Sequence, residues 1–318
     1  MPKRAPVRAQ RLIGFLFSLA EVLLFVIGLY VLTQAVAASG LTGLRLEPVI
    51  AAIPLVGLYV FGARWLGQIL FSNPEISDQS WNDRTVTGQL RSSATLLGLF
   101  VGLLVILEAI GKNAGFSPGT TAVLLAIPLV LSGATLFQIG RAIVTLATPA
   151  ERDEFDAYRA RWVRFFGRGV VALAAASVIL ILVGYLDAGR YLIVATTMTL
   201  GLLAILILVD ELIRTTYAVL IRAESDEAQR LLLPTLLSLA AVVLALPLFA
   251  LIWGARQADL TELWAITKSG FNIGETRISP EAFLTFVFVF MVLFIATRVV
   301  QGALRVNVLP KTKIDPCG

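Results

Sequence analysis

SPEAFLTFVFVFMVLFIATR, residues 279–298, begins as a helix and continues as a membrane span. Ser279 is a favourable N-cap, Pro280 suits the first helical turn, and Glu281 carries a negative charge at the positive end of the helix dipole. Residues 282–297 carry no charge. From Pro280 to Arg298 a helix rises about 27 Å, which is close to the thickness of the hydrocarbon layer. The stretch therefore predicts a transmembrane helix whose Arg298 reaches the lipid headgroups.

The composition of the whole chain agrees with this prediction. Hydrophobic residues make up 58% of the 318 residues, charged residues 15%, and the mean hydropathy is +0.85. These values are typical of an integral membrane protein. Histidine is absent and Cys317 is the only cysteine, so an internal disulfide or a His/Cys metal site cannot form. We expect neither an enzyme nor a cofactor.

Apolar segments of about 20 residues or more recur along the chain, as membrane spans require. The first segment follows four basic residues and ends near Ala35-Val36-Ala37, so it also resembles a cleavable signal. Its length and the internal Glu21 favour a retained span. The sequence predicts about eight transmembrane helices, at residues 12–37, 48–70, 92–110, 120–146, 168–186, 190–212, 232–253 and 281–302.

Basic residues predict the orientation of these spans. If the spans alternate in direction, all but six of the 26 Lys and Arg residues fall on one side, and by the positive-inside rule this is the cytoplasmic side of the inner membrane. Both ends of this chain are then cytoplasmic. The net charge of +5 is spread over the span exits, which favours anionic inner-leaflet lipid over nucleic acid as the partner. The six residues on the other side are Arg45, Lys112, Arg190, Arg256, Lys268 and Arg277.

An arginine followed by further apolar residues marks each inward-running span. These residues are Arg64, Arg141, Arg214 and Arg298. The recurrence predicts four stacked helical hairpins, each with a short outer turn and a longer inner loop. Topology alone would explain the arginines, but it does not explain the repeated apolar extension.

The segment after Arg298 resembles a known family. An amphipathic continuation with Arg305 ends at Pro310 and is followed by Lys311-Thr312-Lys313-Ile314-Asp315. Together with Gly270-Phe271-Asn272-Ile273-Gly274, this pattern resembles the mechanosensitive channel of small conductance family, in particular its large members with extra N-terminal helices. The resemblance implies a homo-heptamer that opens under membrane tension, with a pore helix and a β-rich cytoplasmic domain after the present sequence.

Two further segments are expected to lie at the membrane surface. Thr148-Pro149-Ala150-Glu151 predicts a helix start, and the aromatic residues that follow at helical spacing, with four arginines beside them, predict an in-plane helix over 149–168 on the inner leaflet. A loop helix packed on neighbouring spans is the alternative. Asp259-Leu260-Thr261-Glu262 opens a second short helix on the outer side, with Trp264 at headgroup level and a glycine-punctuated loop at 270–274. The aromatic residues of the inner segment are Phe155, Tyr158, Trp162, Phe165 and Phe166.

Charges and small residues inside the spans complete the sequence-based expectations. Glu21 is the only acid well inside a predicted span, and we expect it to pair with a hydroxyl or an arginine of a neighbouring helix. Gly98 and Gly102 have the spacing that lets membrane helices approach closely, and alanines crowd residues 172–176.

The sequence thus predicts an all-α polytopic membrane protein in three regions. Residues 1–253 form the hairpins of a sensor, 254–280 an outer interfacial helix and loop, and 281–318 the family's span and hinge. The expected function is to sense tension for an ion channel that protects against osmotic stress. A polytopic transporter or lipid-handling protein is the alternative, and a membrane scaffold that binds other subunits is a third possibility.

Overall fold

The computed structural model describes residues 4–40, 43, 46–72, 84–147, 154–221, 232–269, 271–273, 276–278, 285–286, 289–290, 293 and 297. The chain divides into two units: Met1–Val219 with Glu224–Ala245, and Leu220–Ala223 with Leu246–Gly318. The first unit holds the long helices α1 (Arg4–Ala38), α2 (Glu47–Ser72), α3 (Arg84–Ala114), α4 (Pro118–Leu146), α5 (Glu154–Val183) and α6 (Leu186–Ile221), and the first part of α8 (Leu232–Ile252).

Seven helices of the described residues are long and apolar enough to cross a membrane. They confirm the first seven expected spans, with ends that differ from the expected ones by up to eight residues, and the chain is an all-α polytopic membrane protein. Most of the eighth expected span, 281–302, lies outside the described residues. The seven are Ile13–Ala38, Glu47–Phe71, Thr85–Gly111, Pro118–Leu146, Ala160–Val183, Leu186–Tyr217 and Pro234–Ile252.

Short turns join α3 to α4 and α5 to α6. Each turn contains a glycine with positive φ, 64° at Gly115 and 105° at Gly184, a conformation that other residues adopt at a cost. At the start of α4 the Ser117 hydroxyl accepts a hydrogen bond from the Thr120 N–H at 3.2 Å, and Pro118 occupies the first turn. These end signals turn the chain back into the membrane after only a few residues.

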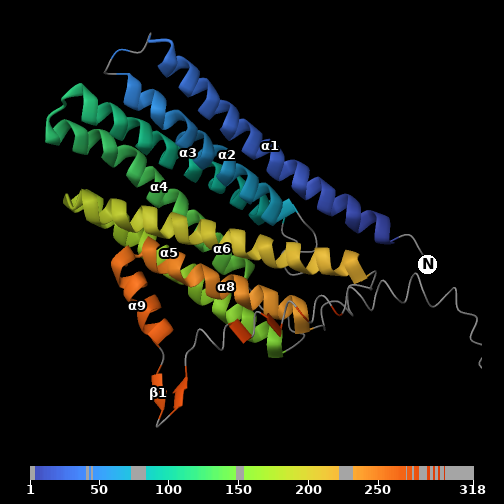
Figure 1. Cartoon of the computed structure of the whole chain (residues 1–318). Helices are drawn as coiled ribbons and strands as arrows, with labels where there is room; N and C mark the ends of the chain where they lie inside the picture. Colours follow the sequence, from blue (N-terminus) through green and yellow to red (C-terminus); the bar gives the residue numbers. More distant parts are fainter. Residues whose placement is uncertain are drawn as a thin grey trace, which may run out of the picture. The chain divides into compact units, whose positions relative to one another are not determined.

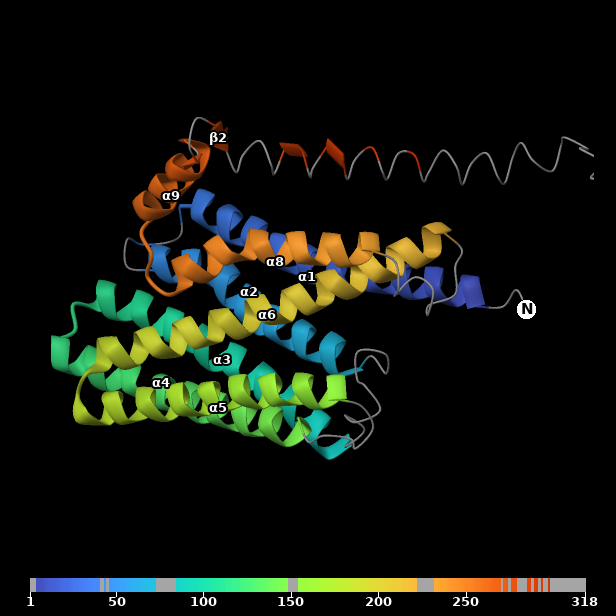
Figure 2. The same cartoon turned by 90° about the horizontal axis from the view of Figure 1, so that it is seen from below.

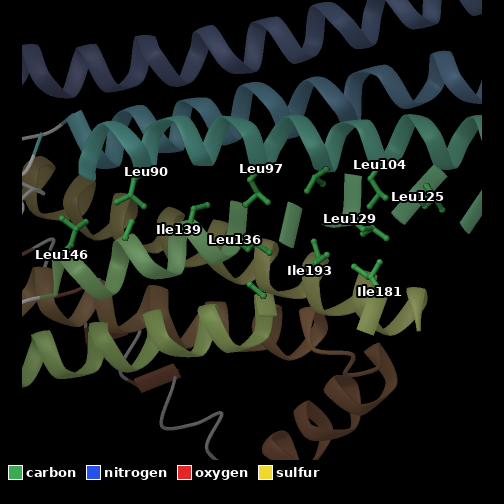
Figure 3. Close-up of a cluster of buried hydrophobic side chains, with 13 residues drawn as sticks. Leu90, Leu97, Leu104, Leu125, Leu129, Leu136, Ile139, Leu146, Ile181 and Ile193 are labelled. Carbon is green, nitrogen blue, oxygen red and sulfur yellow. The ribbon is translucent and has the colours of Figure 1, made fainter. Parts of the chain in front are cut away.

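Consecutive helices from α1 to α5 pack side by side in chain order (Figures 1 and 2). The packing therefore continues across the hairpin boundaries, since α2 lies along α3 and α4 along α5. Buried side chains of α3, α4, α5 and the start of α6 form the apolar core of the first unit. In Figure 3, Leu90, Leu97 and Leu104 of α3 point towards α4, where Leu129 and Leu136 are fully buried.

Glycines allow the closest helix contacts. A Cβ on Gly98 would lie 2.5 Å from the backbone oxygen of Tyr59 on α2, and a Cβ on Gly140 would lie 2.9 Å from the backbone nitrogen of Val171 on α5. A Cβ on Gly102 would likewise lie 3.0 Å from Cγ1 of Val56 on α2. The expected packing seam at Gly98 and Gly102 is confirmed, because only glycine leaves room for the facing backbone.

The prediction of a separate surface helix on the inner side is wrong. The segment 149–168 was expected to be a separate helix in the membrane plane, but α5 runs without a break from Glu154 to Val183. Gly167 does not interrupt the helix, because it is where α5 contacts α4: a Cβ there would lie 2.8 Å from Cγ2 of Val144. The expected capping box at 148–151 lies outside the described residues.

The second unit holds the end of α8, the helix α9 (Gln257–Ser269) and the strands β1 (Phe271–Ile273) and β2 (Thr276–Ile278). α9 begins two residues before Asp259, because the Asp259 Oδ2 atom accepts a hydrogen bond from the Arg256 N–H at 3.0 Å. The expected loop at 270–274 is partly an antiparallel hairpin, with Phe271 opposite Ile278 and Ile273 opposite Thr276 (Figure 1).

Candidate lipid and tension interface

Charged residues mark two levels on α6. Residues 191–209 carry no charge, and at ~1.5 Å per residue this stretch is about 28 Å long, close to the hydrocarbon thickness. Arg190 stands at one end and Asp210 and Arg214 at the other. The two ends of this stretch therefore mark the two membrane boundaries on α6.

The Arg190 boundary contains an ion pair that joins α6 to α3. The Nη2 atom of Arg190 donates a hydrogen bond to Oε2 of Glu108 at 2.6 Å, and the two side chains are 35% and 22% exposed. Next to it, a Cβ on Gly189 would lie 2.8 Å from the backbone oxygen of Ser177 on α5. This boundary thus brings α3, α5 and α6 together. The residues lie far apart in the chain, so no sequence pattern predicts their contact.

The opposite boundary of α6 is tied to α8. The Nε atom of Arg214 lies 3.0 Å from both carboxylate oxygens of Asp210, and the Ser238 hydroxyl of α8 donates to the same carboxylate. Arg214 is 39% exposed, so its guanidinium can reach the headgroups while it remains paired. The structure therefore gives Arg214 a specific partner, where the sequence indicated only an arginine near the end of an inward-running span.

The remaining arginines of this side differ in their contacts. Arg64 on α2 and Arg141 on α4 are exposed. Arg91, which the sequence did not single out, donates through Nη2 to the backbone oxygen of Phe71 and so caps the last turn of α2. Arg298 and Arg305 lie outside the described residues.

The aromatic residues of α5 form one exposed cluster. Tyr158 and Trp162 have ring centroids 6.1 Å apart, Trp162 and Phe165 6.0 Å, and Phe165 and Phe166 6.1 Å. All four side chains are exposed, as are those of Arg161 and Arg168 beside them. Phe155 and Trp264 belong to α5 and α9, but their side chains lie outside the described residues. The sequence pattern thus predicted an aromatic face, and the structure places it on a helix that continues to Val183.

The position of the aromatic cluster follows from the charges of α5. Residues 169–183, from Arg168 to the end of α5, carry no charge, and this part of the helix is about 22 Å long. Phe165 and Phe166 precede Arg168 by two or three residues, or about 3 to 5 Å along the helix. The apolar span Ala160–Val183 includes Trp162, Phe165 and Phe166 but not Tyr158. The cluster therefore lies at the charged end of this span.

Glu21 lies on α1 and its side chain is exposed. The expected hydroxyl or arginine partner is not among its contacts, since within the described part of the chain it has no ion pair or hydrogen bond. The described residues also contain no group of three His, Cys, Asp or Glu side chains that could hold a metal ion. The candidate site consists of charged residues at the ends of the spans and of exposed apolar helix faces.

Comparison of the chain with protein-family models, with curated proteins and with solved structures finds no match.

Proposed function

We propose that this chain is the tension-sensing membrane region of a mechanosensitive channel of the small-conductance type. In this proposal it lies in the inner membrane with both ends in the cytoplasm, assembles with further copies into a homo-heptamer, and precedes the pore helix and the cytoplasmic domain. The resemblance of residues 270–318 to that family supports the assignment, and Arg298 and Arg305 belong to the hinge that would pass movement to the pore.

The observation that carries the proposal is the serial packing of α1 to α5. Helices that lie side by side in chain order present long apolar faces to lipid, and large side chains on these faces are exposed, among them Phe17 (72%), Leu24 (75%) and Leu182 (74%). Such an arrangement has a large lipid-facing perimeter for its number of residues, so the surrounding lipid acts on many helices at once.

Tension gives this perimeter its role. A stretched bilayer is thinner and favours any state with a larger area in the membrane plane or with shorter hydrophobic faces. Charged residues at the ends of the spans, such as Arg190 and Arg214 on α6, hold each helix at a fixed depth because moving them into the hydrocarbon is costly. Thinning therefore changes the free-energy difference between two arrangements of the helices, and the hinge after Arg298 transmits that difference.

The positions of the charged groups also separate this proposal from a transporter. A transporter binds its substrate near the bilayer midplane, where helices are broken and polar. In α6 the charged groups lie at the two ends of an uncharged stretch of about 28 Å, and the helix is continuous across it. The uncharged residues 169–183 of α5 are likewise helical without a break. This distribution suits a sensor whose polar residues set depth.

Patch-clamp recording tests the proposal directly. The complete reading frame that contains these residues is expressed in cells that lack other tension-gated channels, and suction is applied to excised patches. We expect tension-gated currents, and we expect a version without residues 1–253 to open at a different tension. Absence of any tension-gated current from the complete protein would overturn the proposal. An unchanged threshold after the deletion would assign sensing to another part.

A further inference from the structure

Glu21 is the only charged residue between Arg11 and Arg45. Its side chain is exposed on the apolar helix α1. Arg64 is likewise exposed on α2, with no other charge between Glu47 and the end of that helix at Ser72. In the described part of the chain neither side chain has an ion pair or a hydrogen bond. Each charge would be costly if it faced lipid alone.

The contacts between α1 and α2 place these two residues at the same level. The Trp65 Nε1 atom donates to the Ser18 hydroxyl at 2.9 Å, and the rings of Phe25 and Phe61 are 4.0 Å apart. Glu21 lies between Ser18 and Phe25 on α1, and Arg64 lies between Phe61 and Trp65 on α2. Because the two helices run in opposite directions, these contacts enclose both residues in one stretch of the interface, where α1 and α2 lie side by side in both views (Figures 1 and 2).

The helical positions also turn both residues to the same side of this interface. At about 100° per residue, Glu21 lies about 40° around α1 from Phe25, and Arg64 lies about 60° around α2 from Phe61. In an antiparallel pair of right-handed helices these two rotations lead to the same face. Arg64 lies farther around its helix from the contact than Glu21 does, but arginine has the longer side chain, so its guanidinium can reach the carboxylate.

We propose that Glu21 and Arg64 form an ion pair across α1 and α2 when the protein is in the bilayer. In water both charges are solvated and gain little from pairing. Against lipid chains each charge has no solvent, and the other is the only opposite charge at that level of either helix. The pair fixes the register of α1 along α2, because a shift of α1 by one turn would carry Glu21 about 5 Å away from Arg64. This inference is independent of the proposed channel function.

Cysteine substitution tests the proximity. Glu21→Cys and Arg64→Cys are combined in the full chain with Cys317→Ser and treated in native membranes with a short bifunctional thiol reagent. A crosslinking reagent is used because a direct disulfide would require the two Cα atoms to lie within about 7 Å of each other. The matched control combines Arg64→Cys with Leu24→Cys. Leu24 is three residues from Glu21, is 75% exposed and lies on the side of α1 away from α2. We expect crosslinking within one chain for the Glu21 pair and none for the control.

Charge exchange tests the pairing itself. Glu21→Gln and Arg64→Gln should each lower the thermal unfolding midpoint of the protein in lipid nanodiscs, and the exchange Glu21→Arg with Arg64→Glu should recover most of that loss. Crosslinks between two chains at position 21, an equal yield in the Leu24 control, or an exchange variant no more stable than the single variants would each overturn the proposal.

Discussion

Gly98 shows at the scale of one residue how α2 and α3 reach their separation. The position has an ordinary helical backbone, so its requirement for glycine comes from the neighbouring helix. The backbone oxygen of Tyr59 and the Cβ atom of Ala63 would lie 2.5 and 2.7 Å from an added Cβ. Gly88 on the same helix has no atom within 4 Å of that point. The two glycines therefore have opposite expected responses to the same substitution.

Gly98→Ala should destabilise the protein by about 1–3 kcal/mol, because the added methyl forces α2 and α3 apart. Gly88→Ala serves as the matched control and should be neutral or stabilising by about 0.5–1 kcal/mol, since alanine is the better helix former. Thermal unfolding of both variants in detergent measures the difference. Equal midpoints for the two variants would show that the contact at Gly98 is not close.

The Glu108–Arg190 ion pair is a second feature that single-residue substitutions can test. It joins α3 to α6 at a membrane boundary, where partial burial raises the cost of separating the two charges. Arg190→Gln leaves the Glu108 carboxylate without this partner and should cost roughly 1–3 kcal/mol of stability. Arg190→Lys keeps the charge and should lose less.

The control for this prediction is Arg168→Gln. Arg168 is exposed on α5, and a surface substitution of this kind is expected to change stability by less than about 0.5 kcal/mol. Chemical or thermal unfolding of the three variants in the same lipid nanodiscs provides the comparison. If Arg190→Gln and Arg168→Gln behave alike, the ion pair does not hold α3 to α6.

At the scale of elements, the unbroken α5 changes how the aromatic cluster meets the membrane. An in-plane helix would hold Tyr158, Trp162 and Phe165 at one depth. A helix that continues from the span places them at successive depths, about 10 Å apart from Tyr158 to Phe165. The arginines beside them, Arg161 and Arg168, then contact anionic headgroups at different levels.

Spin labels can distinguish these two arrangements. Cysteines at positions 158, 165 and 179, one at a time in the full chain with Cys317→Ser, carry a nitroxide label in reconstituted bilayers. We expect exposure to a water-soluble relaxation agent to fall, and exposure to dissolved oxygen to rise, in the order 158, 165, 179. Ile179 is the control, since it is 60% exposed within the uncharged part of α5. Equal depths at 158 and 165 would restore the in-plane helix.

At the scale of the whole molecule, apolar faces dominate the described helices. A water-filled pore needs polar or small residues along one face of a helix from end to end. In α5 and α6 the charged residues lie at the boundaries, and the glycines at Gly98, Gly140 and Gly167 are used for helix contacts. These features favour our proposal that the region responds to the bilayer and does not itself carry ions.

The chain of residues 1–318 should accordingly conduct no ions. Purified protein is reconstituted into liposomes, and suction is applied to patches up to the tension that ruptures them. We expect no channel openings, whereas a known tension-gated channel reconstituted in parallel verifies that tension reaches the protein. Reproducible tension-activated openings from the purified chain would contradict the assignment of these helices to sensing alone.

Hydropathy and end signals in the sequence determined the all-α class and seven span positions, because a lipid environment forces each apolar segment of this length to satisfy its backbone hydrogen bonds within a helix. Local chemistry also predicted the close contact at Gly98 and the aromatic face of α5. The span positions and the aromatic face depend on residues near one another in the chain, and the contact at Gly98 was indicated by the four-residue spacing of Gly98 and Gly102 within one helix. In a bilayer, local sequence patterns therefore predict the positions of helices well.

Tertiary structure decided the features that depend on distant residues. The Glu108–Arg190 pair, the hydrogen bond from Ser238 to Asp210 and the level of Glu21 beside Arg64 all depend on the register between helices. The course of α5 is also seen only in the tertiary structure: the helix runs without a break past Arg168, and Gly167 within it packs against Val144 of α4. Lipid surrounds every span alike, so it does not specify neighbours or register; side-chain fit and polar contacts between helices do.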